Sequence, residues 1–178
     1  MSKKQRIIMP EQEISLALQR IALQILEHNH GIENLALVGI HTCGVHLAER
    51  LRRLISEQMK GDVFYGSLDI NLYRDDWSLI AQNPVVKTTN IPFDVDNTNL
   101  VLVDDVIFTG RTIRAAMDAI MDYGRPNTIQ LAALIDRGGR ELPIQPDYVG
   151  MKTEIQPNER IRVMLAEENE CNEVVVES

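Results

Sequence analysis

Three short, largely apolar runs are the feature that most limits how this chain can fold. They cover residues 35–40, 100–103 and 129–135, and polar or turn-forming residues follow each of them. A strand covered on one face alternates apolar and polar residues, whereas a strand covered on both faces is apolar throughout. The runs therefore predict an α/β fold with a parallel sheet, right-handed crossovers and helices on both faces. Ligands of such sheets bind beyond the carboxyl ends of the strands.

Apolar residues at helical spacing predict the helices that flank these runs. The first helix covers residues 11–29, a second follows the turn at residues 41–44, and a third covers residues 111–123. Strand, turn and helix thus repeat through the middle of the chain, as in βαβ units.

The remaining segments predict a sheet edge, a long connection and a small lobe. Residues 63–73 alternate apolar and polar side chains, which is typical of a half-exposed strand. Residues 74–97 hold two prolines and no sustained period, which indicates a long, mobile connection. Short runs at residues 161–165 and 174–176 predict the strands of a small lobe. We expect one domain over residues 1–178, with a core at about 11–136 and the lobe at about 137–178.

Composition excludes several classes of protein. The chain has 178 residues, of which 44% are hydrophobic and 25% are charged, as in an ordinary globular domain. No apolar run approaches the ~20 residues that span a bilayer, and the first ten residues contain no signal-peptide apolar region. Two cysteines, Cys43 and Cys171, are too few for a disulfide framework. We therefore expect a cytoplasmic protein without a membrane partner.

The charge balance argues against a surface that attracts nucleic acid everywhere. Lys and Arg total 18 against 26 Asp and Glu, a formal net charge of −8, and only 4% of residues are aromatic. Phosphate backbones require cations, and single strands require stacking surfaces. We expect no DNA partner. A local basic patch on the otherwise acidic protein is kept as an alternative.

Residues 101–112, with the sequence VLVDDVIFTGRT, carry the most chemical information. A buried strand is expected to deliver Asp104 and Asp105 to its carboxyl end, and the turn at residues 109–112 opens a helix. Backbone N–H groups, two hydroxyls and the positive end of the helix dipole suit a phosphate, while carboxylates suit sugar hydroxyls. The combination predicts a ribose 5′-phosphate site. Paired aspartates also occur as helix caps or metal ligands.

Two common nucleotide-binding motifs are missing from the sequence. It contains no Gly-x-x-x-x-Gly-Lys loop and no Gly-x-Gly-x-x-Gly turn. ATP hydrolysis and NAD binding therefore both lose support.

Residues 101–112 resemble the phosphoribosyl pyrophosphate signature of type I phosphoribosyltransferases. Further segments extend the similarity to the bifunctional pyrimidine-operon attenuation regulators that are also uracil phosphoribosyltransferases: residues 37–44, 72–76, 124–126, 136–144 and 146–150. The resemblance implies the type I phosphoribosyltransferase fold, a central mainly parallel sheet flanked by helices, with a small hood of short strands and a mobile lid loop at about 74–97. The implied reaction forms UMP and pyrophosphate from uracil and 5-phosphoribosyl 1-pyrophosphate (PRPP), with Mg²⁺ bound to PRPP.

The resemblance also implies roles for individual residues. Asp104, Asp105 and Arg74 would be catalytic, and the lid would carry Arg74 to the pyrophosphate. The ribose and 5′-phosphate would be bound by Asp104, Asp105, Val106, Phe108, Thr109, Gly110, Arg111 and Thr112. The pyrophosphate would be bound by Thr42, Cys43 and Gly44. The uracil ring would stack on Tyr148 while the Val149 backbone reads its edge. The protein ligands of Mg²⁺ are not identified by the sequence.

Phe108 bears on the choice of base. Related enzymes for 6-oxopurines have an acidic residue at this point of the signature, so the aromatic ring favours uracil over a purine. A purine phosphoribosyltransferase is nevertheless kept as an alternative.

The regulators of this branch also bind the leader of pyrimidine-operon mRNA through a dimer, which would be a homodimer or larger homo-oligomer here. The implied RNA contacts are Arg20, His41, Arg137 and Arg140. Three positions lack donors that are usual in the branch, since Cys43 stands in place of Arg, Gly139 in place of His and Gln145 in place of Arg. Two hypotheses follow: a salvage enzyme with weakened RNA binding, which we favour, and an RNA-binding attenuator with vestigial catalysis.

Overall fold

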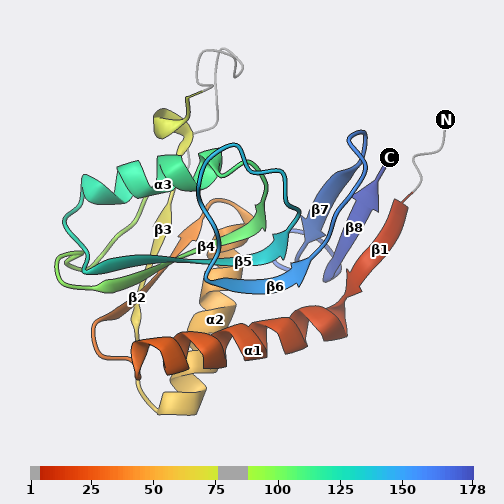
Figure 1. Ribbon diagram of the computed structural model, residues 1–178. Coiled ribbons are helices and arrows are strands. Elements are labelled where there is room, and N and C mark those ends of the chain that lie inside the picture. Colours follow the sequence, from red (N-terminus) through yellow and green to blue (C-terminus); the bar gives the residue numbers. More distant parts are fainter. Residues whose placement is uncertain (1–4, 76–87) are drawn as a thin grey trace.

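A five-stranded parallel sheet forms the centre of the computed structural model, which describes residues 5–75 and 88–178. Its strand order is β3-β2-β4-β5-β6, and every pairing is parallel (Figure 1). The strands are β2 (Leu35–Ile40), β3 (Phe64–Leu68), β4 (Asn99–Ile107), β5 (Thr128–Asp136) and β6 (Tyr148–Lys152). The three apolar runs thus form the neighbouring strands β2, β4 and β5, as predicted.

Helices cover both faces of this sheet, which explains why its central strands are mostly apolar. Helices α1 (Glu11–Asn29) and α2 (Cys43–Met59) lie on one face, and α3 (Arg111–Met121) lies on the other (Figure 1). Within β2, Leu35 and Leu37 belong to the core cluster of α1 and α2. The alternate residues Ala36 and Val38 belong to the cluster of α3. Side chains of a strand point alternately to its two faces, so each run fills both cores.

A second, three-stranded antiparallel sheet joins the two ends of the chain. It consists of β1 (Gln5–Pro10), β8 (Glu173–Glu177) and β7 (Arg160–Met164) in the order β1-β8-β7. Figure 1 shows this sheet beside the large one. The expected short strands near residues 161–165 and 174–176 are confirmed. Strand β1 was not expected, because its partner lies at the opposite end of the sequence and leaves no local signal.

The edge strand β3 is shorter than the strand predicted over residues 63–73. It ends at Leu68, and a single 3₁₀ turn, Asn71–Tyr73, follows. The Asp69 carboxylate accepts a hydrogen bond of 2.9 Å from the Asn71 N–H. This contact stabilises a turn, so the alternation of inward and outward side chains ends here. Leu72, expected on the covered side, is 67% exposed.

Two further boundaries differ from those expected. Strand β4 continues through Asp104 and Asp105 to Ile107, because its pairing with β5 runs on to Asp136. Strand β6 falls in the range expected for the small lobe, yet it pairs with β5 in the large sheet. Residues 76–87 of the expected lid loop lie outside the described residues. No described helix has the length and apolar character that crossing a membrane requires.

Candidate functional site

The turn between β4 and α3 forms the first part of the site. Strand β4 ends at Ile107, and α3 begins at Arg111 directly after Gly110, whose φ of 92° lies in the left-handed region that glycine adopts without strain. The Arg111 N–H donates to Thr109 Oγ1 at 3.3 Å. The first N–H groups of a helix lack partners within the helix and lie at the positive end of its dipole. This turn can therefore bind a phosphate, as the sequence predicts.

The paired carboxylates lie inside strand β4 rather than beyond its end. Asp104 is 6% exposed, and its Oδ1 accepts the Asp105 N–H at 2.9 Å. Burial, followed by the charge of Asp105, raises the pKa of the Asp104 carboxyl well above its ordinary value. The strand geometry fixes both carboxylates next to the phosphate turn, so a ligand need not order them when it binds.

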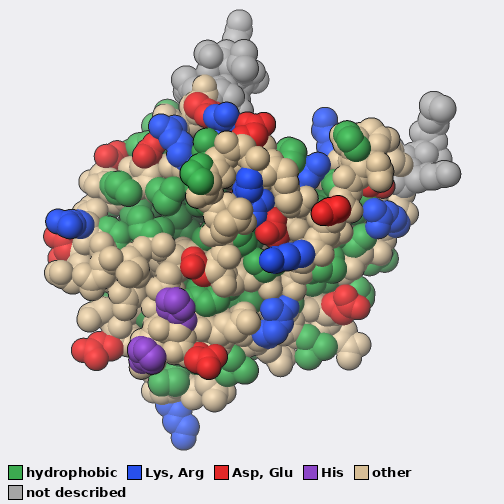
Figure 2. Space-filling model, viewed as in Figure 1, with side chains coloured by type: hydrophobic (Ala, Val, Ile, Leu, Met, Phe, Trp, Pro, Cys, Tyr) green, Lys and Arg blue, Asp and Glu red, His purple; other side chains and the backbone are tan. Residues whose placement is uncertain are grey.

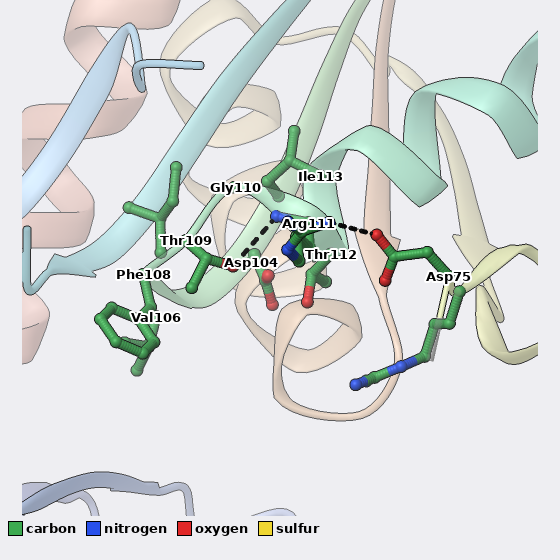
Figure 3. Close-up of a pocket in the computed structure, with 11 residues that line it drawn as sticks. Asp75, Asp104, Val106, Phe108, Thr109, Gly110, Arg111, Thr112 and Ile113 are labelled. Atoms are coloured by element: carbon green, nitrogen blue, oxygen red, sulfur yellow. Dashed lines mark hydrogen bonds and ion pairs between the residues drawn. The ribbon is translucent and has the colours of Figure 1, made fainter. Parts of the chain in front are cut away.

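A cavity of about 400 Å³ lies in front of this turn. Its lining consists of Arg74, Asp75, Asp104, Val106, Ile107, Phe108, Thr109, Gly110, Arg111, Thr112 and Ile113. In Figure 3, Phe108 and Val106 lie on one side of the turn and Asp75 on the other, with Asp104 and Thr112 between them. The cavity therefore has an apolar end and a polar end. All residues expected to bind ribose and 5′-phosphate line it, except Asp105.

Arg111 sits at the polar end within an ion-pair cluster. Its Nη1 lies 2.5 Å from Asp75 Oδ2, as Figure 3 shows, and its Nε lies 2.7 Å from Glu141 Oε2. Both contacts are exposed, and an anion in the turn can compete with them. Asp75 was not expected to line the site, although it stands beside Arg74 in the segment that carries the resemblance.

A second cavity adjoins the first and shares Arg74, Asp104, Val106 and Thr112 with it. Its other lining residues are His41, Thr42, Cys43, Asp69, Ile70, Asn71 and Asp105. The expected pyrophosphate segment thus faces the carboxylates, and the His41–Thr42 peptide bond is cis. Asp69 and Asn71 were not expected here. They follow strand β3, so the rule that ligands bind beyond the carboxyl ends of parallel strands could have identified them.

Cys43 does not have the properties of a nucleophile. Burial, with the charges of Asp105 and Asp104 next, raises the pKa of its thiol to about 12. Cys43 Sγ lies 3.8 Å from the Val163 carbonyl of strand β7. The thiol is therefore protonated at neutral pH.

Tyr148 and Val149, expected at the base, do not line either cavity. Tyr148 is 4% exposed, and its hydroxyl donates to Gln130 Oε1 at 2.7 Å. Its ring meets His28 of α1 edge-on, with ring centroids 6.0 Å apart. Burial, followed by the charge of Asp147, raises the pKa of Tyr148 to about 12. In this structure Tyr148 packs in the core beneath α1, and no base can stack on its ring.

The residues expected to contact RNA all have partners within the chain. Arg20 donates to the carbonyls of Val149 and Gly150 at 2.9 and 2.6 Å. His41 Nε2 lies 3.3 Å from the Thr88 carbonyl. Arg137 stacks on the Phe108 ring, with its Cζ 3.8 Å from the ring centroid.

Arg140 is the most enclosed of these cations. Its Nη2 lies 2.9 Å from Asp136 Oδ1, and both side chains are nearly buried. Its Nε and Nη1 donate to the carbonyls of Ile144 and Phe108 at 2.8 and 2.9 Å. Because this guanidinium has three partners within the chain, its main contribution is to stabilise the fold.

The chain is similar to known phosphoribosyltransferases over almost its whole length. Residues 5–167 match the family model described as "Phosphoribosyl transferase domain". Three relatives carry the name "Bifunctional protein PyrR". The relative from Syntrophobacter fumaroxidans is 50% identical over 97% of this chain and 92% of its own length. The relative from Listeria monocytogenes is 51% identical over 98% and 97%, and that from a Thermoanaerobacter species is 56% identical over 95% of each.

Solved structures share the fold at much lower identity. A hypoxanthine phosphoribosyltransferase of Trypanosoma cruzi matches with a TM-score of 0.71 and 17% identity, covering 96% of this chain and 95% of that one. A hypoxanthine-guanine phosphoribosyltransferase of Bacillus anthracis matches with a TM-score of 0.72 and 20% identity, covering 99% of both. These matches agree on the arrangement of the sheet and helices.

Proposed function

The chain belongs to the phosphoribosyltransferase family, and from this membership we propose that it transfers the 5-phosphoribosyl group of PRPP to uracil, forming UMP and pyrophosphate. The observation that carries the proposal is a cavity that joins the turn at residues 109–112 to the fixed carboxyl group of Asp104, with Asp105 lining the adjoining cavity. The relatives named as bifunctional proteins are about half identical over nearly the full length, which supports the same reaction here.

In this proposal the 5′-phosphate binds at residues 109–112, where the helix dipole and backbone N–H groups face it. Asp104 and Asp105 accept hydrogen bonds from the ribose hydroxyls. As pyrophosphate leaves, positive charge develops on the ribose ring, and a carboxylate fixed in strand β4 stabilises it without rearranging.

The pyrophosphate is assigned to the second cavity, beside Thr42 and Cys43, whereas Gly44 is buried and does not line this cavity. Arg74 lines both cavities and can contact a diphosphate that bridges them. Asp69, Asp104 and Asp105 also line the second cavity, so free pyrophosphate meets repulsion there. Carboxylates of this kind suit a hard divalent cation, and Mg²⁺ bound to PRPP supplies neutralisation of the leaving group. Among the described residues no cluster of three or more His, Cys, Asp or Glu could hold a metal alone, so the diphosphate contributes ligands of its own.

The uracil ring is assigned to the apolar end of the first cavity, beside Val106 and Phe108. A flat base is bound by apolar side chains on its face and polar groups at its edge. This assignment replaces the one to Tyr148, which lies in the core.

A second, regulatory role is supported by the name that the relatives share. We propose that UMP in this same cavity is the signal, and that the RNA affinity is weak because Arg20, Arg137 and Arg140 have partners within the chain. The homodimer or larger homo-oligomer stays a prediction.

The test of the catalytic proposal is incorporation of radiolabelled uracil, hypoxanthine and guanine in the presence of PRPP and Mg²⁺. UMP formation is expected, and an Asp105→Asn variant should lower kcat/KM by roughly 100-fold, because a preorganised charge is lost. Asp118→Asn is the matched control, since Asp118 is an exposed carboxylate on α3 that forms an ion pair with Arg114. Nucleotide formation from a purine alone contradicts the choice of substrate.

A further inference from the structure

The Phe108 ring forms part of the wall of the first cavity, and the Arg137 guanidinium stacks on it. Phe108 is 42% exposed and lines the first cavity. The Arg137 guanidinium lies over the ring, with its Cζ 3.8 Å from the centroid. A guanidinium at this distance is attracted by the electron-rich face of the ring. The ring therefore has one face covered by the protein while other parts face the cavity.

The backbone around this stack is held on both sides. Arg140 Nη1 donates to the Phe108 carbonyl at 2.9 Å, and the Arg137 N–H donates to the Ile107 carbonyl at 3.1 Å. Arg137 Nε is buried, and no acceptor among the described residues reaches it. Stacking on Phe108 is thus a principal contact of this guanidinium.

Gly139 supplies the space that the ring occupies. A Cβ atom at this position would lie 2.5 Å from Phe108 Cε2 and 3.0 Å from Cδ2. Real Cβ atoms do not approach so closely, so any other residue at 139 must displace the ring. Gly138 makes an informative comparison: its φ is 70° against 75° for Gly139, yet a Cβ there would meet nothing within 4 Å.

We propose that Gly139 is a positioning residue for base recognition, because it lets the Phe108 ring lie against Arg137 and form the wall that the uracil ring contacts. The inference rests on the proposed function and names the groups that recognise the base. A side chain at position 139 cannot coexist with this position of Phe108.

Uracil is a small ring, so the orientation of its wall matters for affinity. A side chain that is already fixed loses little conformational entropy when it binds a ligand. The three atoms nearest to a Cβ at position 139 all belong to the Phe108 ring, whereas the proposed contacts to phosphate and ribose come from the turn and the carboxylates. The ratio of the affinities for UMP and for ribose 5-phosphate therefore isolates the contribution of the base.

The experiment measures the dissociation constants of UMP and ribose 5-phosphate by calorimetry for the wild type, Gly139→Ala, Gly138→Ala and Phe108→Leu. Gly139→Ala and Phe108→Leu are expected to lower the preference for UMP by roughly 3- to 10-fold, as for loss of one aromatic contact. Affinity for ribose 5-phosphate should stay within about twofold. Gly138→Ala adds comparable backbone strain without touching the ring, so it should retain the wild-type preference.

Three results would overturn the proposal: equal loss of both ligands in Gly139→Ala, an unchanged preference in folded Phe108→Leu, or a wild type that binds both ligands equally. If Gly139→Ala does not fold, Phe108→Leu decides. A wild type that forms no UMP, yet shows the expected changes in preference, contradicts the proposed reaction while supporting this role for Gly139.

Discussion

At the scale of single residues, the least ordinary group is the buried Asp104 carboxyl. A strand that continues past its expected end places this side chain in the interior, next to a second carboxylate. Burial and the charge of Asp105 favour the protonated form in the folded state. The position in which Asp104 can contact a ligand therefore lowers the stability of the folded protein.

This cost predicts the effect of pH on stability. The folded-state pKa lies above the unfolded value of about 3.9, so the folded protein binds the proton more tightly. Stability is consequently lost as the pH rises above this unfolded value. Asp104→Asn removes the titrating group and with it this loss of stability. The variant should raise the free energy of unfolding by about 1–2 kcal/mol at pH 8 and by less at pH 5. Urea unfolding at the two pH values measures it.

The same variant should lower kcat/KM by roughly 100-fold, because an amide N–H group replaces one of the two carboxyl oxygens that are proposed to contact the ribose. Asp118→Asn again serves as the control for both measurements, since its carboxylate is exposed. Equal stability of Asp104→Asn and the wild type at both pH values would contradict the account of Asp104.

At the scale of elements, the connection between β5 and β6 is hydrogen-bonded to the turn for which we propose phosphate binding. The N–H groups of Glu141 and Leu142 both donate to the Thr109 carbonyl, at 2.9 and 3.2 Å. Arg140 links the same connection to the Phe108 carbonyl and to Asp136 at the end of β5. The phosphate turn thus depends on a segment about 30 residues further along the chain.

Arg140→Met should therefore destabilise the protein by roughly 3 kcal/mol, because it leaves the nearly buried Asp136 carboxylate without its cation. Urea unfolding of Arg140→Met, Asp136→Asn and the double variant separates the causes. Arg140→Met should lower the free energy of unfolding clearly less in the Asp136→Asn background, because no buried charge is left unpaired there. An equal cost in both backgrounds would show that the ion pair is not the reason.

At the scale of the whole molecule, charge limits the choice of partners. The net charge is −8, and Figure 2 shows Lys and Arg interspersed with Asp and Glu over one face. Affinity for RNA comes mainly from cations that neutralise phosphates. A chain whose candidate arginines contact its own carbonyls and carboxylates has fewer of them to offer.

We expect weak binding of pyrimidine-operon leader RNA, with a dissociation constant of about 1–100 μM at physiological salt, in the range of non-specific contacts. A gel shift with and without UMP, alongside an RNA of scrambled sequence, measures it. Tight binding that requires UMP and the leader sequence would instead favour the attenuator hypothesis.

Much of the fold and of the phosphate site could be predicted from local patterns. The apolar runs predict β2, β4 and β5 because a strand buried on both faces is mostly apolar, and the helices follow from their spacing. Residues 109–112 predict the phosphate turn because its donors lie within a few residues of one another. The sequence did not predict where β1 and β6 pair. Strand β1 pairs with β8 and β6 pairs with β5, and these pairings depend on tertiary contacts that leave no local signal.

The sequence by itself determined the parallel sheet and the phosphate turn, because periodicity and backbone chemistry act over a few residues. Only the tertiary structure decided that Tyr148 lies in the core, that Asp104 is buried within a strand, and that Gly139 makes room for Phe108. These outcomes depend on which surfaces meet when the elements pack, and packing joins residues whose separation along the chain carries no local signal.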